Sequence, residues 1–123
     1  MIKLIYCLHR KEGMSREAFQ EYWYNTHAPL VRSLGATLRI SRYVQCHTLE
    51  STVNAALAEP RQGPDAYDGV AELWWESETD LQEAMNSEEG QEAARQLVED
   101  EGRFIDVSRS PLWVSRERPI IEP

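Results

Sequence analysis

The sequence has no long apolar segment, few cysteines and no excess of basic residues. No stretch approaches the ~18–20 consecutive apolar residues that a membrane-spanning helix requires, and the N-terminal residues become charged too early for a secretory signal. The two cysteines, Cys7 and Cys46, are too few for a disulfide framework or a four-thiolate zinc site. We therefore expect a cytoplasmic protein with two free, buried thiols.

Basic side chains are in the minority. Thirteen Lys and Arg residues stand against twenty-one Asp and Glu residues, which gives a formal net charge of −8. This balance repels phosphate backbones and anionic lipid surfaces. We expect neither a nucleic-acid partner nor a membrane partner.

The chain also lacks the short motifs that bind nucleotides or carry hydrolytic chemistry. It contains no Gly-x-Gly-x-x-Gly, no phosphate-binding loop, no Gly-x-Ser-x-Gly and no His-Glu-x-x-His. The three histidines, His9, His27 and His47, do not have the spacing of metal ligands. The sequence therefore predicts a protein that uses neither a cofactor nor a metal ion.

The length and composition of the chain are typical of one folded domain, because the chain has 123 residues and 41% of them are hydrophobic. Residues 2–9 form an apolar run that predicts a buried strand. Ser15 can cap the helix that follows. Pro29 indicates that this helix ends or restarts at residues 26–29, with a second short helix through Leu34.

The middle of the chain predicts two strands and a long connection. Residues 38–49 alternate in polarity and predict the second strand, with Tyr43 and His47 on one face. Residues 50–66 predict a long excursion with a helical turn at residues 52–57, and loops of this length are often functional. Residues 67–76 return to strand character.

The C-terminal part predicts two helices, a strand and a tail. Ser77 and Ser87 can each cap a helix, and the second helix runs to Gly102. We expect the acidic residues of this helix, Glu101 included, to be solvated rather than part of a site. Residues 104–114 predict the last strand, and residues 116–123 follow as a tail.

The order strand, helix, strand, strand, helix, strand is typical of an α+β ferredoxin-like plait. In this βαββαβ fold a four-stranded antiparallel sheet carries both helices on one face. The strands have apolar residues at both parities, so the uncovered face would expose more apolar area than a monomer usually tolerates. We expect a homodimer, with a cavity for a small apolar ligand between sheet and helices or between the two sheets.

Residues 10–23, 27–31 and 67–74 resemble the EthD family. The most specific part is a Tyr-Trp-x-x-x-His-Ala-Pro run, formed here by Tyr22, Trp23, His27, Ala28 and Pro29. The similarity extends over residues 1–115, which we take as the domain, apart from the 50–66 excursion.

This resemblance implies a dimeric α+β barrel that takes part in the breakdown or building of small organic molecules, by ether degradation or polyketide-type ring chemistry. The wider superfamily contains cofactor-free monooxygenases, isomerases, cyclases, decarboxylases and dehydratases, so the fold does not fix the reaction. Haem binding, also known in the superfamily, would need His27 or His47 as the iron ligand and is the less favoured alternative.

The candidate catalytic residues are His27 and Asp68, which both lie in segments that resemble the family. Imidazole has an unperturbed pKa of ~6.5 and can give or take a proton near neutral pH. Alternatively, His27 only fixes the helix end before Pro29, and Asp68 only binds turn amides beside Gly69. In this topology we expect His27 and Asp68 to lie apart.

Five further residues are candidates for substrate binding. Tyr43 can donate a hydrogen bond to a carbonyl or phenolate, and His47 can handle a proton on the same strand face. Arg42 would need a carboxylate if it pointed inward. Trp75 and Tyr6 would line an aromatic pocket. Solvent exposure or core packing is the alternative for each of them.

The sequence therefore favours a cofactor-free enzyme of small-molecule metabolism that moves protons with His27. Lyase- or isomerase-type chemistry on an aromatic or unsaturated carbonyl compound would include dehydration, cyclisation, decarboxylation and rearrangement. A cofactor-free monooxygenase is the second interpretation. A non-catalytic protein that holds a hydrophobic metabolite is the third.

Overall fold

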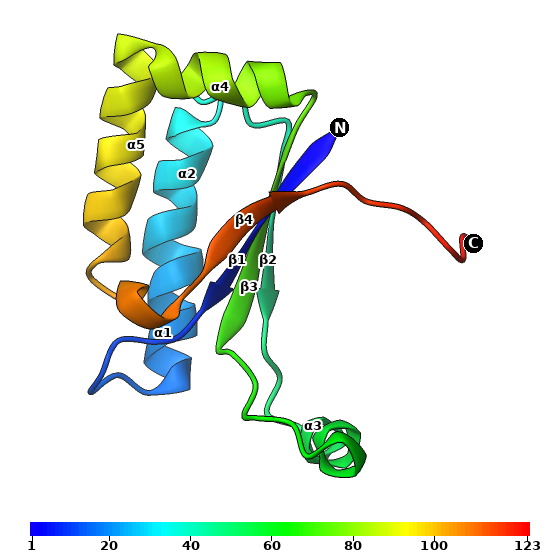
Figure 1. Ribbon diagram of the computed structural model, residues 1–123. Coiled ribbons are helices and arrows are strands. Elements are labelled where there is room, and N and C mark those ends of the chain that lie inside the picture. The colour runs from blue at the N-terminus through cyan, green and yellow to red at the C-terminus, as the bar shows by residue number, and fades with distance from the viewer.

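The computed structural model describes residues 1–123 and shows a four-stranded sheet with helices on one of its faces (Figure 1). The strands are β1 (Ile2–Leu8), β2 (Arg42–His47), β3 (Gly69–Trp75) and β4 (Leu112–Ser115). Their order across the sheet is β2-β3-β1-β4, and all neighbours are antiparallel. This topology confirms the ferredoxin-like plait.

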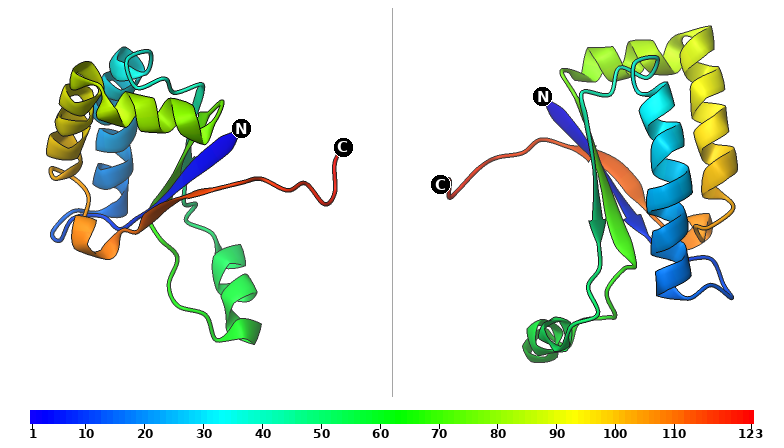
Figure 2. Two further views of the ribbon diagram at one scale, coloured as in Figure 1. Left: turned by 45° about the horizontal axis from the view of Figure 1, so that its top comes forward. Right: turned by 180° about the vertical axis from the view of Figure 1, so that it is seen from behind.

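The helical layer contains two long segments that lie side by side. The first consists of α1 (Arg16–Tyr22), a π-helical turn (Trp23–His27) and α2 (Ala28–Leu34). The second is α5 (Glu88–Glu101), and α4 (Glu78–Asn86) crosses one end of the layer (Figure 2). None of the helices combines the length and the apolar composition needed to cross a lipid bilayer.

The predicted serine caps are present at all three helix starts. The side chains of Ser15, Ser77 and Ser87 each accept a hydrogen bond from a backbone N–H three residues later. Each bond satisfies one of the free donors in a first helical turn. These three serines therefore set where the helices begin.

The helix restarts within residues 26–29, as the sequence predicted, because α2 begins at Ala28 with Pro29 in its first turn. The sequence did not predict that the helical path is unbroken. The chain continues through the π-helical turn, in which the N–H of Ala28 donates to the carbonyl of Trp23, five residues earlier. Pro29 has no N–H to donate to the preceding turn, and the wider turn accommodates it. As a result Trp23 and His27 both lie on the buried side, with 1% and 5% of their surfaces exposed.

Two predicted strands are shorter than the sequence suggested. β2 starts at Arg42 because Arg39 has a positive φ of 59° and Leu38 is buried instead of pairing in the sheet. The last strand covers only Leu112–Ser115. Phe104 and Ile105, expected in that strand, are buried in the core beside the end of α5.

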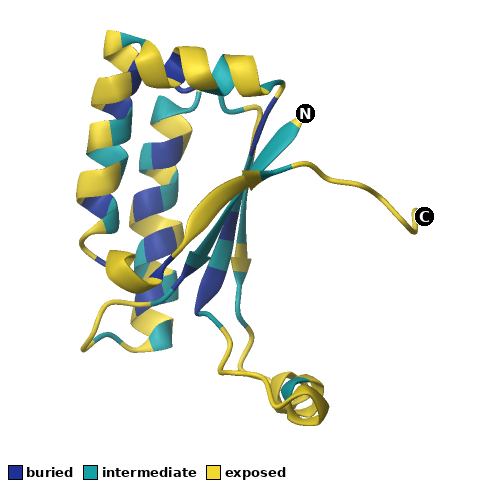
Figure 3. Cartoon of the chain, viewed as in Figure 1, coloured by how far each residue is buried: buried dark blue, intermediate teal, exposed yellow.

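The connection between β2 and β3 contains the predicted helical turn as α3 (Thr52–Ala58). This helix stands away from the sheet, and none of its residues is buried (Figures 1 and 3). The tail of residues 116–123 also extends away from the helical layer (Figure 1). The core therefore lies between the sheet and the paired helical segments.

The register of the strands separates the two faces of the sheet. Ala71 pairs with Tyr6 of β1 and with Gln45 of β2, so these residues share the face that the helices cover. The opposite face combines apolar with polar side chains: Lys3, Ile5, Cys7, Arg42, Val44, Cys46, Val70, Glu72, Trp74 and Trp113. Both thiols are free, but Cys7 is half-buried and Cys46 is exposed on this face, so the expectation of two buried thiols was wrong.

Gly90 lies at the junction of α4 and α5, where the backbone leaves no room for a side chain. A Cβ atom built there would lie 1.7 Å from the carbonyl oxygen of Ala84, which cannot retreat without moving the backbone. We expect Gly90→Ala to lower the free energy of unfolding by about 2 kcal/mol, measured by urea denaturation. Gly35→Ala is the control, because its Cβ would meet ordinary contacts at 3.5 Å. Equal unfolding midpoints for both variants would contradict the close approach.

Candidate active site

His27 lies at the end of the π-helical turn and points into the core beneath the helices. Its Nδ1 atom is 2.7 Å from Oδ2 of Asp100, near the end of α5, and its ring centre is 5.0 Å from that of Phe104. Only 5% of His27 and 5% of Asp100 is exposed. The imidazole is therefore held by one buried carboxylate from the neighbouring helix.

Two further groups bind the same carboxylate. The hydroxyl of Tyr22 donates to Oδ1 of Asp100 at 2.6 Å, and the guanidinium of Arg103 donates to that oxygen at 3.0 Å. Burial acts to raise the pKa of Asp100, but the hydrogen bonds from Tyr22, His27 and Arg103 outweigh it and lower that pKa. Asp100 is therefore ionised at neutral pH.

The ionised carboxylate fixes the state of the imidazole. Burial lowers the pKa of His27, and the hydrogen bond and charge of Asp100 oppose this only in part. At neutral pH His27 is therefore uncharged, and Asp100 accepts the proton that remains on Nδ1. Nε2 then carries the lone pair and has no hydrogen-bond partner within the chain. This is the arrangement of a general base.

His27 is part of the wall of a small, partly open cavity between the sheet and the helices. The cavity has a volume of about 50 Å³. Its walls come from both layers and are formed by Tyr6, Leu8, Trp23, His27, Val31, Tyr43, Ala71, Leu73, Leu97, Glu101 and Ile105. The predicted residues His27, Tyr6 and Tyr43 therefore come together in one apolar space.

Glu101 is a second titratable group in this cavity. The hydroxyl of Tyr6 donates to Oε1 of Glu101 at 3.0 Å. Burial raises the pKa of Glu101 to about 7, the hydrogen bond from Tyr6 opposes the shift, and the charge of Asp100 adds to it. Glu101 can therefore hold or release a proton near neutral pH.

Tyr43 is fixed at the cavity wall by a polar chain along β2. The amide nitrogen of Gln45 donates to the hydroxyl of Tyr43 at 2.7 Å and to the carbonyl of Trp23 at 3.0 Å. Burial raises the pKa of Tyr43, so its hydroxyl stays protonated at neutral pH. Tyr43 can donate a hydrogen bond to a bound molecule.

Asp68 lies outside this cavity, at the start of β3. It accepts hydrogen bonds from the backbone N–H and the guanidinium of Arg10, at 2.7 and 2.8 Å, and from Arg16 at 2.9 Å. Burial acts to raise the pKa of Asp68, but these three donors and their charges lower it. Asp68 ties the ends of β1 and α1 to β3 and has different partners from His27.

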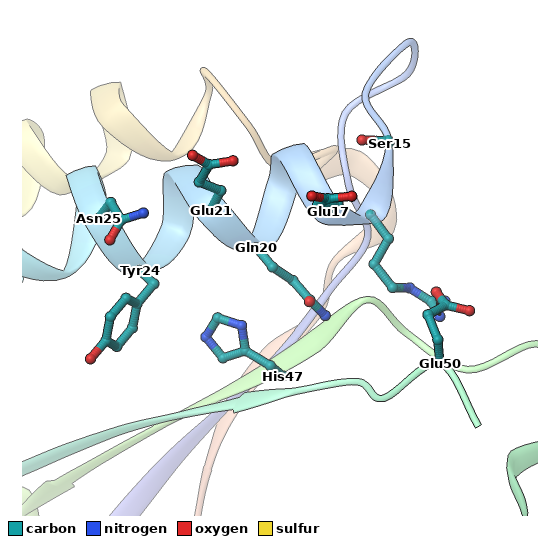
Figure 4. Close-up of a pocket in the computed structure, with 9 residues that line it drawn as sticks. Ser15, Glu17, Gln20, Glu21, Tyr24, Asn25, His47 and Glu50 are labelled. Carbon is teal, nitrogen blue, oxygen red and sulfur yellow. Dashed lines mark hydrogen bonds and ion pairs between the residues drawn. The ribbon is translucent and has the colours of Figure 1, made fainter.

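His47 lies on the outer side of Trp23, with the two ring centres 4.6 Å apart. It borders an open cleft of about 900 Å³ between α1 and the chain after β2 (Figure 4). Most side chains of this cleft are polar. Glu17 and Glu21 are exposed, whereas the amide nitrogen of Gln20 donates to the carbonyls of Thr48 and Asp68. His47 and His27 therefore face different spaces.

The remaining two candidates do not line the cavity. Arg42 lies on the open face of the sheet, with its guanidinium 4.6 Å from the ring centre of Trp74. Trp75 is buried on the helix side, where its indole N–H donates to the carbonyl of Leu38 at 2.7 Å. Arg42 is exposed, and Trp75 closes the core near the start of β2.

A model of the EthD domain matches residues 11–108 of the chain. The chain belongs to the EthD family. A protein named "Decarboxylase" from Claviceps purpurea (strain 20.1) is 26% identical over 114 residues, which are 90% of this chain and 79% of that protein.

Solved structures are similar to this EthD domain over nearly its whole length. An EthD family protein from Bacillus halodurans C-125 superposes with a TM-score of 0.64 at 24% identity, covering 96% of this chain and 99% of that one. A variant of SnoaB, a cofactor-independent oxygenase from Streptomyces nogalater, superposes with a TM-score of 0.54 at 11% identity, covering 99% and 97%. These similarities support the fold.

The sequence analysis missed both acids that face the site of this EthD domain. Asp100 was not singled out, and Glu101 was expected on the solvated side of its helix, which was wrong. The helical repeat contained the signal, because Ala93 and Leu97 precede Asp100 and Glu101 at spacings that place them on one face. These two acids were missed because α5 contains several solvated glutamates, from which composition alone does not distinguish them.

No three His, Cys, Asp or Glu side chains of the EthD domain are placed to hold a metal ion together. The cavity offers the side chains of His27, Glu101, Tyr6 and Tyr43 as its polar groups. These groups can give, take and hold protons. They suit the acid and base steps of reactions at a carbonyl group.

Proposed function

We propose that this EthD protein is an enzyme of small-molecule metabolism that acts in the cytoplasm on an aromatic or unsaturated carbonyl compound. His27 is its general base, and the reaction is of the lyase or isomerase type: dehydration, cyclisation, decarboxylation or rearrangement. The observation that carries the proposal is the buried His27–Asp100 pair, whose free imidazole nitrogen belongs to an apolar cavity. Such a pair activates an imidazole as a base.

The cavity can accept a ring compound only if its walls move apart. A volume of about 50 Å³ is far below the ~300–1,000 Å³ of ordinary ligand sites. Its walls are aromatic and aliphatic side chains, and Trp23 and Tyr43 can pack against a flat ring. Binding would therefore separate the helices from the sheet and widen the cavity.

A homodimer is the second part of the proposal. The open face of the sheet carries Ile5, Val44, Val70 and the half-exposed ring of Trp113. Among them Lys3 forms an ion pair with Glu72, so a partner surface would have to match charge as well as shape. A second copy can do both, because a two-fold axis brings the same surface against itself.

Decarboxylation is the reaction to test first, since the name of the Claviceps relative points to it. The probe is benzoylacetic acid, an aromatic β-keto acid, with CO₂ release as the measured quantity. Proton transfer alone is followed with β-tetralone and benzoylacetone in D₂O, by loss of the NMR signal of the hydrogens next to the carbonyl. The enzyme should accelerate at least one of these processes above the buffer rate.

The same samples separate the rival interpretations. Oxygen uptake coupled to loss of the probe would favour a cofactor-free monooxygenase. Tight binding of the probes, seen as quenching of tryptophan fluorescence, without exchange, CO₂ release or oxygen uptake, would favour a non-catalytic binder and contradict the proposed enzyme.

A further inference from the structure

Asp100 and Glu101 are neighbours in α5 but serve different sides of the cavity. Adjacent helical residues point about 100° apart. Asp100 therefore turns toward the first helical segment and binds His27, while Glu101 turns toward the sheet and accepts the hydrogen bond from Tyr6. The helix end presents one carboxylate to the base and a second carboxylate to the cavity.

The contacts of Glu101 leave part of its carboxyl group free. Tyr6 binds Oε1, and Oε2 has no hydrogen-bond partner within the chain. No Lys or Arg side chain lines the cavity, so an ionised Glu101 would have no cation beside it. In such an apolar space a carboxyl group favours its neutral form, which carries a proton that it can donate.

We propose that Glu101 is the general acid that acts together with His27. It donates its proton to the carbonyl oxygen of the substrate while His27 removes a proton from the adjacent carbon. The inference rests on the proposed function and deepens it, because it adds a second catalytic residue to the same site. Tyr6 is a positioning residue that orients Glu101.

The step is balanced within these two residues and the substrate. Nε2 of His27 takes the proton, and the electron pair of the broken C–H bond forms a carbon–carbon double bond. The π pair of the carbonyl group takes the proton from Glu101. The products are a neutral enol, an imidazolium ion paired with Asp100, and a carboxylate at Glu101. To restore the enzyme, the imidazolium ion returns its proton to the same or another carbon, and the carboxylate of Glu101 takes back the proton of the enol hydroxyl as the carbonyl group re-forms.

Four titratable groups lie around Glu101: Tyr6 from β1, Tyr43 from β2 and His27 from the first helical segment line the same cavity, and Asp100 precedes it in its own helix. Burial, the hydrogen bond from Tyr6 and the charge of Asp100 set its pKa. Because the pKa of Glu101 is about 7, the proton needed for donation is lost above that pH. The pKa of His27 is below its ordinary value, so the base is lost only at lower pH. The exchange rate should therefore follow a bell-shaped pH profile with its alkaline limb near pH 7.

The decisive variant is Glu101→Gln, which keeps the shape of the side chain but removes the carboxylic proton. With whichever probe the wild type turns over, we expect kcat to fall about 100-fold, with KM nearly unchanged and the alkaline limb absent. Glu99→Gln, an exposed position of the same helix, is the matched control and should retain the wild-type rate and profile. Circular dichroism and urea midpoints check that the variants fold.

Tyr6→Phe tests the same idea without touching the acid itself. The hydrogen bond from Tyr6 lowers the pKa of Glu101, so its removal should raise that pKa and move the alkaline limb to higher pH. A purely structural role of Tyr6 would lower the rate without moving the limb. An unmoved limb in Tyr6→Phe, or a full rate in Glu101→Gln, would overturn the assignment.

The two proposals fail in different ways. If the wild type accelerates none of the probe reactions, the proposed function is wrong and the role of Glu101 falls with it. If His27→Gln loses the reaction but Glu101→Gln keeps it, the base assignment stands and only the general acid is wrong.

Discussion

Replacing His27 by Gln should lower the rate of probe exchange by about 1,000-fold. Gln is close to His in size and its amide can still donate to Asp100, so the buried pair keeps a hydrogen bond. The amide has no basic nitrogen, however, and below pH 7 Glu101, the other acid or base of the cavity, keeps its proton and does not replace Nε2 as the acceptor. Probe affinity, followed by tryptophan fluorescence, should change little.

His47→Gln is the matched control for this experiment. His47 lies outside the cavity, beyond the ring of Trp23, and its loss should leave the exchange rate within about two-fold of the wild type. A His27→Gln variant that is folded and retains a tenth of the wild-type rate would remove His27 as the base. A large loss of rate in His47→Gln would instead place the reaction in the outer cleft.

Replacing Asp68 by Asn should lower the free energy of unfolding but leave the reaction rate unchanged. The carboxylate of Asp68 is 7% exposed and binds two guanidinium groups, which Asn cannot neutralise. Breaking such a buried pair costs roughly 3–5 kcal/mol, and we expect about 3 kcal/mol because Arg10 and Arg16 still reach water. The exchange rate of the folded variant should equal that of the wild type.

The pH dependence gives a second check on Asp68. Its pKa is lower in the folded protein than in the unfolded chain. Its contacts therefore stabilise the fold fully above the unfolded value of ~3.9 and lose this contribution as the pH falls through the folded value. Urea midpoints of wild type and Asp68→Asn should converge in acid. A stable variant without exchange activity would instead place Asp68 in the chemistry.

The fold was predictable because local signals agreed with one another. Serine caps marked the helix starts, and the order of strands and helices allowed few topologies. The positions of Leu38 and Phe104 were not predictable in the same way. Both are apolar residues near strands, and only the packing of the whole chain decides that they fill the core instead of extending the sheet.

The site was predictable in part. His27 stood out by its chemistry, and Tyr6 and Tyr43 by the expected cavity. Asp100 and Glu101 could not be separated from the other acids of α5 by composition, since only their helical phase relative to Leu97 distinguishes them. Which face of the sheet meets the helices depended on the register between strands, and that register is a tertiary property.

The π-helical turn has a consequence for how the first helix is wound. Its buried residues Phe19, Trp23, His27 and Val31 follow one another at intervals of four. In a regular α-helix of ~3.6 residues per turn, each such interval overshoots by about 40°, so the row would spiral out of the core by Val31. A turn that takes in one more residue corrects this phase and keeps His27 beneath the helix. Shortening the chain by one residue there would swing the imidazole and everything after it around the helix axis.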